Sequence, residues 1–206
     1  MKGGHLTPAL SPSDGEREVP LMRSAGAINL AALIFLALAL ISNRGSAQTS
    51  REYQIKAAFV FNFAEFTDWP PEAFENKDSP LVIGILGTDP FGSVLDETVR
   101  NEKVRGHRLT VERYRTVEEI RTCHILYIGQ SEASHLDQVL DALQGKPVLT
   151  VSDIEGSAPR GVMIRFLTEK NKIRLRINVE AARAVRLTIS SKLLRAAAEI
   201  VATQKK

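Results

Sequence analysis

The sequence predicts a single α/β domain with a mixed, mostly parallel sheet flanked by helices, ending in a C-terminal β-hairpin and two terminal helices. Three short, nearly continuous apolar runs, Leu81–Leu86, His124–Ile128 and Pro147–Val151, are typical of strands buried on both faces. Segments with helical spacing separate them, and strands that alternate with helices form right-handed β-α-β units. Two later runs, 161–167 and 172–178, alternate apolar and polar residues as hairpin strands do.

The first element expected is a long helix over Arg51–Thr67, which contains no Gly or Pro and stops before Trp69-Pro70-Pro71. Apolar residues surround it almost completely, so the helix is either buried on several sides or covered by a partner. The charged residues Lys56, Glu65 and Asp68 make this segment a poor membrane span.

Two further helices are expected between the buried strands. Asp89 is placed to cap a helix over Phe91–Val99, and a helix over 131–143 ends at Gly145. Between them the sequence predicts a strand, Arg108–Tyr114, and a short helix, Thr116–Ile120.

The C-terminal hairpin has a predicted register. With Lys170-Asn171 at the tip, Phe166 faces Leu175 and Ile164 faces Ile177 on the inner side. After the hairpin, Asn178 caps a helix to about Leu187 and Ser190 caps the last helix. The apolar residues of that last helix are Leu193, Leu194, Ala197, Ile200 and Val201.

The same register places Arg165 opposite Arg176 on the outer side of the hairpin, with Arg174 nearby. Like charges directly across a sheet are mildly unfavourable, so this pair predicts a compensating anion. The anion is a nearby carboxylate, a small ligand or a partner surface, and a plain solvated sheet face remains the alternative.

The N-terminal segment predicts export. Residues 22–47 have a basic start, an apolar core of about 15 residues over Ala27–Ile41 and the small residues Gly45-Ser46-Ala47, which together form a signal peptide. Cleavage is expected near Ala47/Gln48, with an uncleaved anchor as the alternative. Residues 1–21 are interpreted as a disordered lead or as the result of a start codon assigned too early, and 48–206 as the α/β domain.

The net charge and the number of cysteines limit the classes of partner and of covalent cross-link that the chain can have. Removing residues 1–47 subtracts four basic and three acidic residues from a net charge of +3, which leaves about +2 and no field that favours nucleic acid. The single cysteine, Cys123, excludes an internal disulfide. We expect a buried, inert thiol there, with an intermolecular bridge or a reactive thiol as the alternative.

Catalytic and metal motifs are weak. The loop Gly84–Asp89 lacks the phosphate-binding spacings, and Asp89 places a carboxylate where a phosphate would lie, so the loop is interpreted as structural. The three scattered histidines, His107, His124 and His135, form no metal pair, and no cofactor is expected. The hydrolase candidates are Ser190 and the Asp153/Glu155 pair, for which helix capping and a solvated loop are the plainer interpretations.

The chain resembles the YfiR-like family of exported bacterial regulators over nearly its whole mature length. The resemblance is carried by Tyr53–Phe63 with Trp69-Pro70, Ile83–Phe91, Cys123–Ile128, Val148–Asp153, Asn171–Asn178 and Ile189–Leu194. It implies a periplasmic α/β domain without catalytic activity that represses an inner-membrane diguanylate cyclase by contacting its periplasmic sensor part, which lowers cyclic di-GMP and opposes biofilm growth. The resemblance also leaves open whether the chain forms a homodimer. Some family members have several cysteines and respond to redox state, but control by an internal disulfide does not carry over to a chain with one cysteine.

Three function classes remain open at this point. The favoured class is a non-enzymatic repressor whose partner surface includes Val60, Phe61, Phe63 and Phe66. The second is a sensor of a small anion, bound by Arg165, Arg174 and Arg176. The third is an exported hydrolase. No metal or catalytic residue is assigned in the favoured class.

Overall fold

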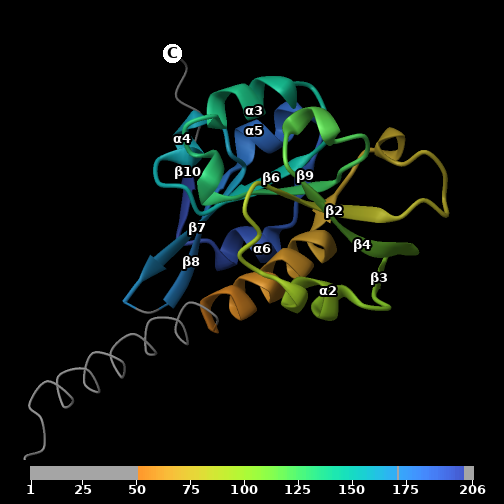
Figure 1. Cartoon of the computed structure of the whole chain (residues 1–206), viewed down its shortest axis with the longest axis horizontal. Coiled ribbons are helices and arrows are strands. Elements are labelled where there is room, and N and C mark those ends of the chain that lie inside the picture. Colours follow the sequence, from red (N-terminus) through yellow and green to blue (C-terminus); the bar gives the residue numbers. More distant parts are fainter. Residues whose placement is uncertain (1–50, 171, 202–206) are drawn as a thin grey trace, which may run out of the picture. The chain divides into compact units, whose positions relative to one another are not determined.

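The computed structural model describes residues 51–170 and 172–201 as an α/β domain (Figure 1). The predicted lead, signal peptide and cleavage site at 1–21, 22–47 and Ala47/Gln48 lie outside the described residues. None of the helices within those residues is long and apolar enough to cross a membrane.

The main sheet is mixed and mostly parallel, which confirms the predicted fold class. Its strand order is β10-β8-β7-β6-β5-β2-β4-β3. Parallel pairing joins β4, β2, β5, β6 and β7, and β8 returns antiparallel to β7. The strands are β2 (Leu81–Leu86), β3 (Lys103–Val104), β4 (His107–Tyr114), β5 (Ile125–Ile128), β6 (Leu149–Ser152), β7 (Ile164–Glu169), β8 (Lys172–Asn178) and β10 (Glu199–Val201).

The central strands build a core on each face of the sheet because their side chains alternate in direction. In β5, Ile125 and Tyr127 join one buried cluster, and Leu126 and Ile128 join the other. The continuous apolar runs in the sequence therefore reflect burial on both faces, as predicted. The helices that cover these faces are α2 (Ser93–Val99), α3 (Leu136–Ala142), α4 (Ser157–Arg160), α5 (Val179–Ala184) and α6 (Ser191–Ala196), with short 3-10 turns at η1 (Pro71–Ala73), η2 (Val117–Glu119) and η3 (Gln130–Glu132).

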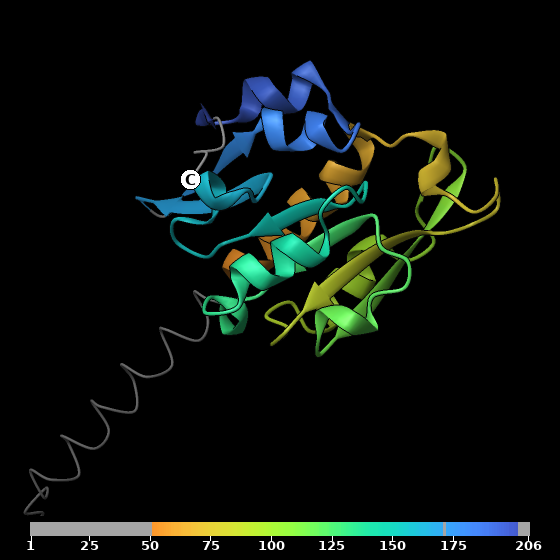
Figure 2. The same cartoon turned by 90° about the horizontal axis from the view of Figure 1, so that it is seen from above.

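The first described helix spans residues 51–65, and we call it the aromatic helix. It lies with α2 on one face of the sheet, and α3 lies on the opposite face (Figures 1 and 2). The rings of Phe59 and Phe63 lie 6.1 and 5.6 Å from that of Phe166 on β7. Phe59 and Phe63 thus pack the helix against the hairpin strand β7.

The hairpin register is as predicted. Ile164 pairs with Ile177, Arg165 with Arg176, and Phe166 with Leu175. The predicted caps also form: the Asn178 side chain accepts from Ala181 N–H at 3.0 Å, and Ser190 Oγ accepts from Lys192 N–H at 3.2 Å.

A second, two-stranded sheet joins β1 (Thr67–Asp68) to β9 (Thr188–Ile189). It extends through a hydrogen bond of 2.8 Å from Ser190 N–H to Phe66 O, which ties the end of the aromatic helix to the start of α6. The sequence patterns do not predict these short strands, β3 or α4.

Several helix limits differ from the prediction. The helix α2 starts at Ser93, and Asp89 instead accepts hydrogen bonds from Phe91 and Gly92 N–H in a turn before it. The helix α3 starts at Leu136 after η3. The last helix ends at Ala196, so Ile200 belongs to β10, which pairs in parallel with β8. Edge pairing with a long strand outweighs the helical spacing of so short a segment.

Candidate functional site

A cleft of about 530 Å³ lies at the carboxyl ends of β5 and β6. Open parallel sheets commonly bind ligands outside the carboxyl ends of their strands. Gln130 follows β5, and Asp153 and Glu155 follow β6. The opposite wall comes from the first turns of the aromatic helix and from β7.

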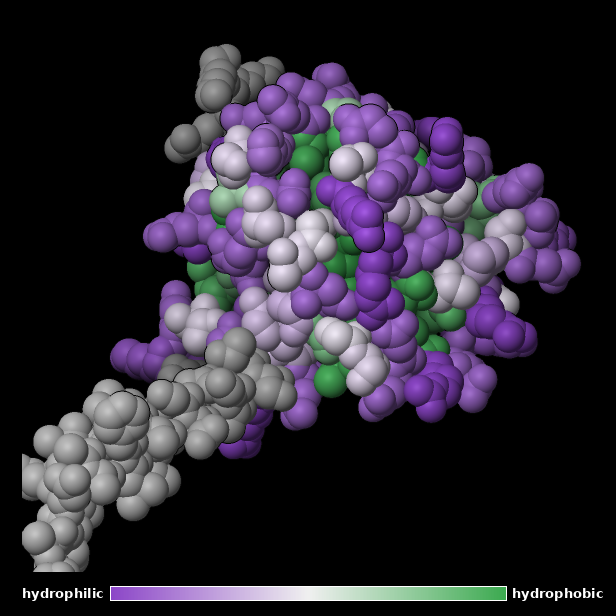
Figure 3. All heavy atoms as spheres, viewed as in Figure 1, coloured by the Kyte–Doolittle hydropathy of each residue, from purple (hydrophilic) through white to green (hydrophobic). Residues whose placement is uncertain are grey.

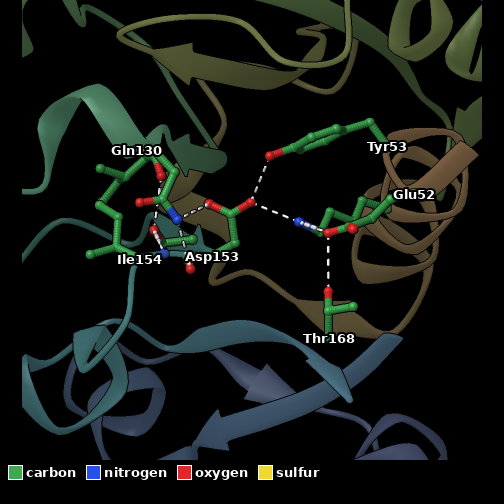
Figure 4. Close-up of polar contacts among 9 residues, drawn as sticks. Glu52, Tyr53, Gln130, Asp153, Ile154 and Thr168 are labelled. Atoms are coloured by element: carbon green, nitrogen blue, oxygen red, sulfur yellow. Dashed lines mark hydrogen bonds and ion pairs between the residues drawn. The ribbon is translucent and has the colours of Figure 1, made fainter. Parts of the chain in front are cut away.

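Asp153 is the centre of the polar network in this cleft. Its Oδ2 lies 2.7 Å from Lys56 Nζ and accepts a hydrogen bond of 2.9 Å from Tyr53 OH. Its Oδ1 accepts from Gln130 Nε2 at 3.0 Å. Figure 4 shows Tyr53 and Gln130 pointing at Asp153 from opposite sides. The network therefore fastens the aromatic helix to the loops that follow β5 and β6.

Lys56 is buried as a charged group. Only 2% of the residue is exposed, and Nζ also lies 2.7 Å from Glu52 Oε1, one helical turn earlier. Burial by itself lowers the pKa of Lys56, but the hydrogen bonds to Asp153 and Glu52 outweigh it, so the pKa is raised. Burial likewise favours protonated Asp153, and the bond to Lys56 reverses this and lowers the pKa of the carboxyl. Both groups are ionised near neutral pH.

One buried polar atom at the cleft, Arg165 Nε, has no hydrogen-bond partner among the described residues. The hydroxyl of buried Tyr127 interacts with Asp153 and Tyr53. Burial raises the pKa of Tyr127, and the charge of neighbouring Asp153 raises it further. Among the described residues Arg165 Nε is thus a buried donor without an acceptor, which is rare in folded proteins.

The three predicted arginines do not form one site. Arg165 lines the cleft, whereas Arg176 donates through Nε to Glu199 Oε2 at 2.7 Å. The anion that compensates Arg176 is thus a carboxylate of β10, one of the options left open by the sequence. Arg174 is exposed and pairs across the hairpin with Leu167.

The predicted partner residues divide into two groups. Val60 and Phe63 are 0% exposed and belong to the core, so the expectation that Val60 is exposed is wrong. Phe61 and Phe66 are half-buried and pack against the same core. These four apolar residues differ in exposure because the sheet covers only one side of the helix.

The outward side of the aromatic helix carries a short apolar row. Ile55 is 43% exposed, Ala58 is exposed, and half-buried Phe61 completes the row at successive spacings of three residues. Figure 3 shows a mostly hydrophilic surface on the face it presents, with apolar residues in separate small areas. The row Ile55, Ala58 and Phe61 is thus a short apolar strip on the outer side of the helix.

Two of the three hydrolase candidates, Asp153 and Ser190, have structural roles. The expectation of a solvated loop is wrong for Asp153, which is bound to Lys56, while Glu155 is exposed. Ser190 is a helix cap, as interpreted from the sequence.

The glycine loop is structural as well. Asp89 Oδ2 accepts from Arg113 Nε at 2.8 Å, so a cation of the same chain already neutralises this carboxylate. A Cβ on Gly84 would lie 2.7 Å from the Tyr114 ring, which leaves no room for a side chain.

The amino ends of the strands hold His124 and Cys123, both buried. Val82 N–H donates to His124 Nδ1 at 3.1 Å and His124 Nε2 lies 3.0 Å from Ala73 O, which fits a neutral ring protonated at Nε2. Burial lowers the pKa of His124 to about 4 and raises that of the Cys123 thiol to about 12. Cys123 is therefore the buried, inert thiol that the sequence predicted.

Sequence reasoning missed the Lys56–Asp153 pair. The one available signal was a lysine within an otherwise apolar helix, four residues after Glu52. A buried lysine requires a carboxylate, but nothing in the sequence identifies a partner 97 residues away.

Comparison with known proteins gives one result. The family model described as YfiR/HmsC-like matches residues 53–198, which include every residue that lines the cleft except Glu52 and nearly all of the described domain. A search of curated proteins finds no match.

Proposed function

The chain belongs to the YfiR/HmsC-like family, and on that premise we propose that it is a non-enzymatic, exported regulator of an inner-membrane diguanylate cyclase. It binds the periplasmic part of the cyclase, represses it and lowers cyclic di-GMP. The observation that carries the proposal is the family match over 53–198. The structural roles of Asp153 and Ser190 support a function without catalysis.

We infer that the outward row of the aromatic helix contributes to the partner surface. Ile55 is its most exposed member, and exposed apolar side chains on a folded domain favour contact with another protein. Of the residues first considered, Phe61 stays in this surface, whereas the buried positions Val60 and Phe63 support it from within the core.

The test is capture of the cyclase from cell envelopes by tagged protein carrying Ile55→Asp. We expect the wild-type protein to retain a membrane protein with a GGDEF output domain, and Ile55→Asp to lose it and to raise cellular cyclic di-GMP. Gln54→Asp is the matched control, because it adds the same charge at an adjacent exposed position. Equal capture by both variants, at equal thermal stability, would show that the row is not the partner surface.

A small-anion sensor is the second candidate, and it rests on Arg165 alone. The cleft lining carries four carboxylates, Glu52, Asp153, Glu155 and Glu169, against the two cations Lys56 and Arg165. This excess disfavours a multiply charged anion. Thermal shift against a panel of phosphates and carboxylates tests the alternative, since a true ligand well above its Kd raises stability by a few kcal/mol.

A further inference from the structure

The strand β7 is paired along only part of one edge. On the β6 side its partners are Val151, which pairs with Ile164, and Ser152, which pairs with Arg165. The strand continues to Glu169, and β8 accompanies it along the other edge to the end. Within the described residues, 166–169 thus have no neighbouring strand on the β6 side.

The backbone groups on this free edge can be assigned from the hairpin ladder. Asn178 N–H donates to Met163 O at 2.7 Å. Because hydrogen-bonded residues alternate along an antiparallel pair, Arg165, Leu167 and Glu169 direct their backbone groups toward β8 as Met163 does. The backbone groups of Phe166 and Thr168 then point away from β8, toward the side where β6 has ended. Thr168 is exposed as a residue, and no strand of the described residues pairs with it on this side, so its N–H and C=O are left for an added strand.

The free edge opens into the cleft. All residues from Arg165 to Glu169 line it. The remaining lining residues include Tyr53 and Lys56 from the aromatic helix, and Asp153 and Glu155 from the loop after β6. The cleft thus occupies the position that a continued β6 would take. Arg165 Nε, which is buried and has no acceptor among residues 51–170 and 172–201, lies where this added segment begins.

The charges around the cleft indicate which kind of peptide could pair with the free edge. Asp153 is neutralised by Lys56, whereas Glu155 and Glu169 are exposed carboxylates at its rim. These free carboxylates favour basic side chains. A backbone carbonyl of the segment is the acceptor that Arg165 Nε lacks.

We propose that the cleft binds an extended, basic peptide segment of the regulated partner, which adds as a strand to the free edge of β7. About four residues, roughly 13 Å of extended chain, match the unpaired length. Main-chain hydrogen bonds supply affinity in such strand addition, and alternate side chains supply specificity. The inference rests on the proposed function for the identity of the partner, but the strand addition itself is testable without it.

The direct test uses the exported, ¹⁵N-labelled protein and a synthetic peptide, acetyl-Thr-Lys-Val-Lys-Thr-Lys-amide. We expect binding to slow hydrogen exchange of the Thr168 amide and to shift its resonance. The same peptide with N-methyl groups on alternate residues, and its twin with Glu in place of Lys, should each bind at least about tenfold more weakly. Equal binding of the N-methylated peptide, or no change at Thr168, would overturn the proposal. So would a Thr168 amide that is already protected without peptide, because another segment would then fill the edge.

Two variants separate the backbone donor from the side chain. Thr168→Pro removes the N–H on the free edge, which an edge strand tolerates, and should weaken peptide binding about tenfold. Thr168→Val retains the N–H but loses the hydroxyl that donates to Glu52 Oε1, so it should bind within about twofold of wild type. Equal binding of the two variants contradicts strand addition, and the N-methylated peptide decides the question if the proline variant fails to fold.

The envelope capture distinguishes this inference from the proposed function. If the wild type and Thr168→Val retain the cyclase and Thr168→Pro loses it, the strand addition is supported. If all three retain the cyclase, the strand addition is wrong and the regulator function stands. If wild type retains no cyclase, the regulator function fails, and the peptide exchange experiment alone decides the strand addition.

Discussion

At the carboxyl ends of the parallel strands Lys56 and Asp153 are buried as an ion pair, whereas at the amino ends of the same sheet His124 and Cys123 are buried neutral. The difference follows from the partners that each end offers. Asp153 receives a cation and two neutral donors, while His124 meets backbone groups and the ring of Phe74, stacked 4.4 Å away. Burial alone neutralises a side chain, and burial beside an opposite charge preserves ionisation.

The contrast is thus between a buried ion pair at one end of the sheet and buried neutral groups at the other. In the part of the chain that the structure describes, the cleft at the carboxyl end has exposed carboxylates at its rim and a buried guanidinium nitrogen without an acceptor, and the proposed peptide site rests on these two features. The amino end satisfies His124 on both ring nitrogens and holds its thiol protonated. The two ends should therefore respond differently to mutation and to pH.

The largest effect is expected from Lys56→Met, which leaves Asp153 buried without its cation. Removing one member of a buried pair costs about 3–5 kcal/mol, so we expect the free energy of unfolding in urea at pH 7 to fall by at least about 3 kcal/mol. The loss should shrink at acid pH, where Asp153 becomes protonated and no uncompensated charge remains.

The double variant Lys56→Met/Asp153→Asn is the control for this prediction. Asn at this position has no charge, its single side-chain oxygen can still accept from Gln130, and its NH2 group can donate to the Tyr53 oxygen, so most of the lost stability should return. A single variant that loses less than about 1 kcal/mol would mean that the pair is solvated and that the contrast between the ends is wrong.

The next effect concerns pH at the amino end. The pKa of His124 is about 4 in the folded protein, against 6.5 unfolded, so between these values the unfolded state binds more protons. The contribution of His124 to stability is therefore fully present above pH 6.5 and is lost as pH falls toward 4. The total loss over that window is about 3 kcal/mol.

Urea unfolding at intervals from pH 7 to 4 measures this loss. In His124→Asn the amide oxygen can still accept from Val82 N–H, and the slope over the window should flatten. An unchanged slope in His124→Asn would assign the pH dependence to other groups. The Asp153 carboxyl, whose pKa is lowered, acts in a separate window below about pH 4.

The sequence predicted the parts of the fold that depend on neighbouring residues. The register of Arg165 with Arg176 follows from period-two alternation and a turn, both local, and the caps Asn178 and Ser190 act within one helical turn. The end of the chain was predicted wrongly, because Ile200 satisfies a helical spacing and only the presence of β8 makes it a strand.

The candidate site was less predictable, because it is assembled from distant segments. Tyr53 and Asp153 are 100 residues apart, and the unpaired edge of β7 arises where β6 happens to stop. Composition and spacing indicate that a helix is buried, but they do not tell which of its residues face the sheet. For that reason Val60 and Phe63 were expected at a partner surface and lie in the core.

The smallest effect expected is that of Tyr53→Phe, which removes one of the donors to Asp153 and keeps the ring. Because Lys56 and Gln130 remain bound to the carboxylate, the free energy of unfolding should fall by only about 1 kcal/mol. Losing a hydrogen bond to the charged form raises the pKa of Asp153, so acid unfolding should begin at a higher pH. Tyr114→Phe is the matched control, since it also deletes a hydroxyl that donates to a carboxylate, here that of exposed Glu112. If Tyr114→Phe loses about as much stability as Tyr53→Phe but its acid unfolding does not shift, the pH response belongs to the Asp153 network. If acid unfolding shifts equally in both variants, the response does not belong to that network.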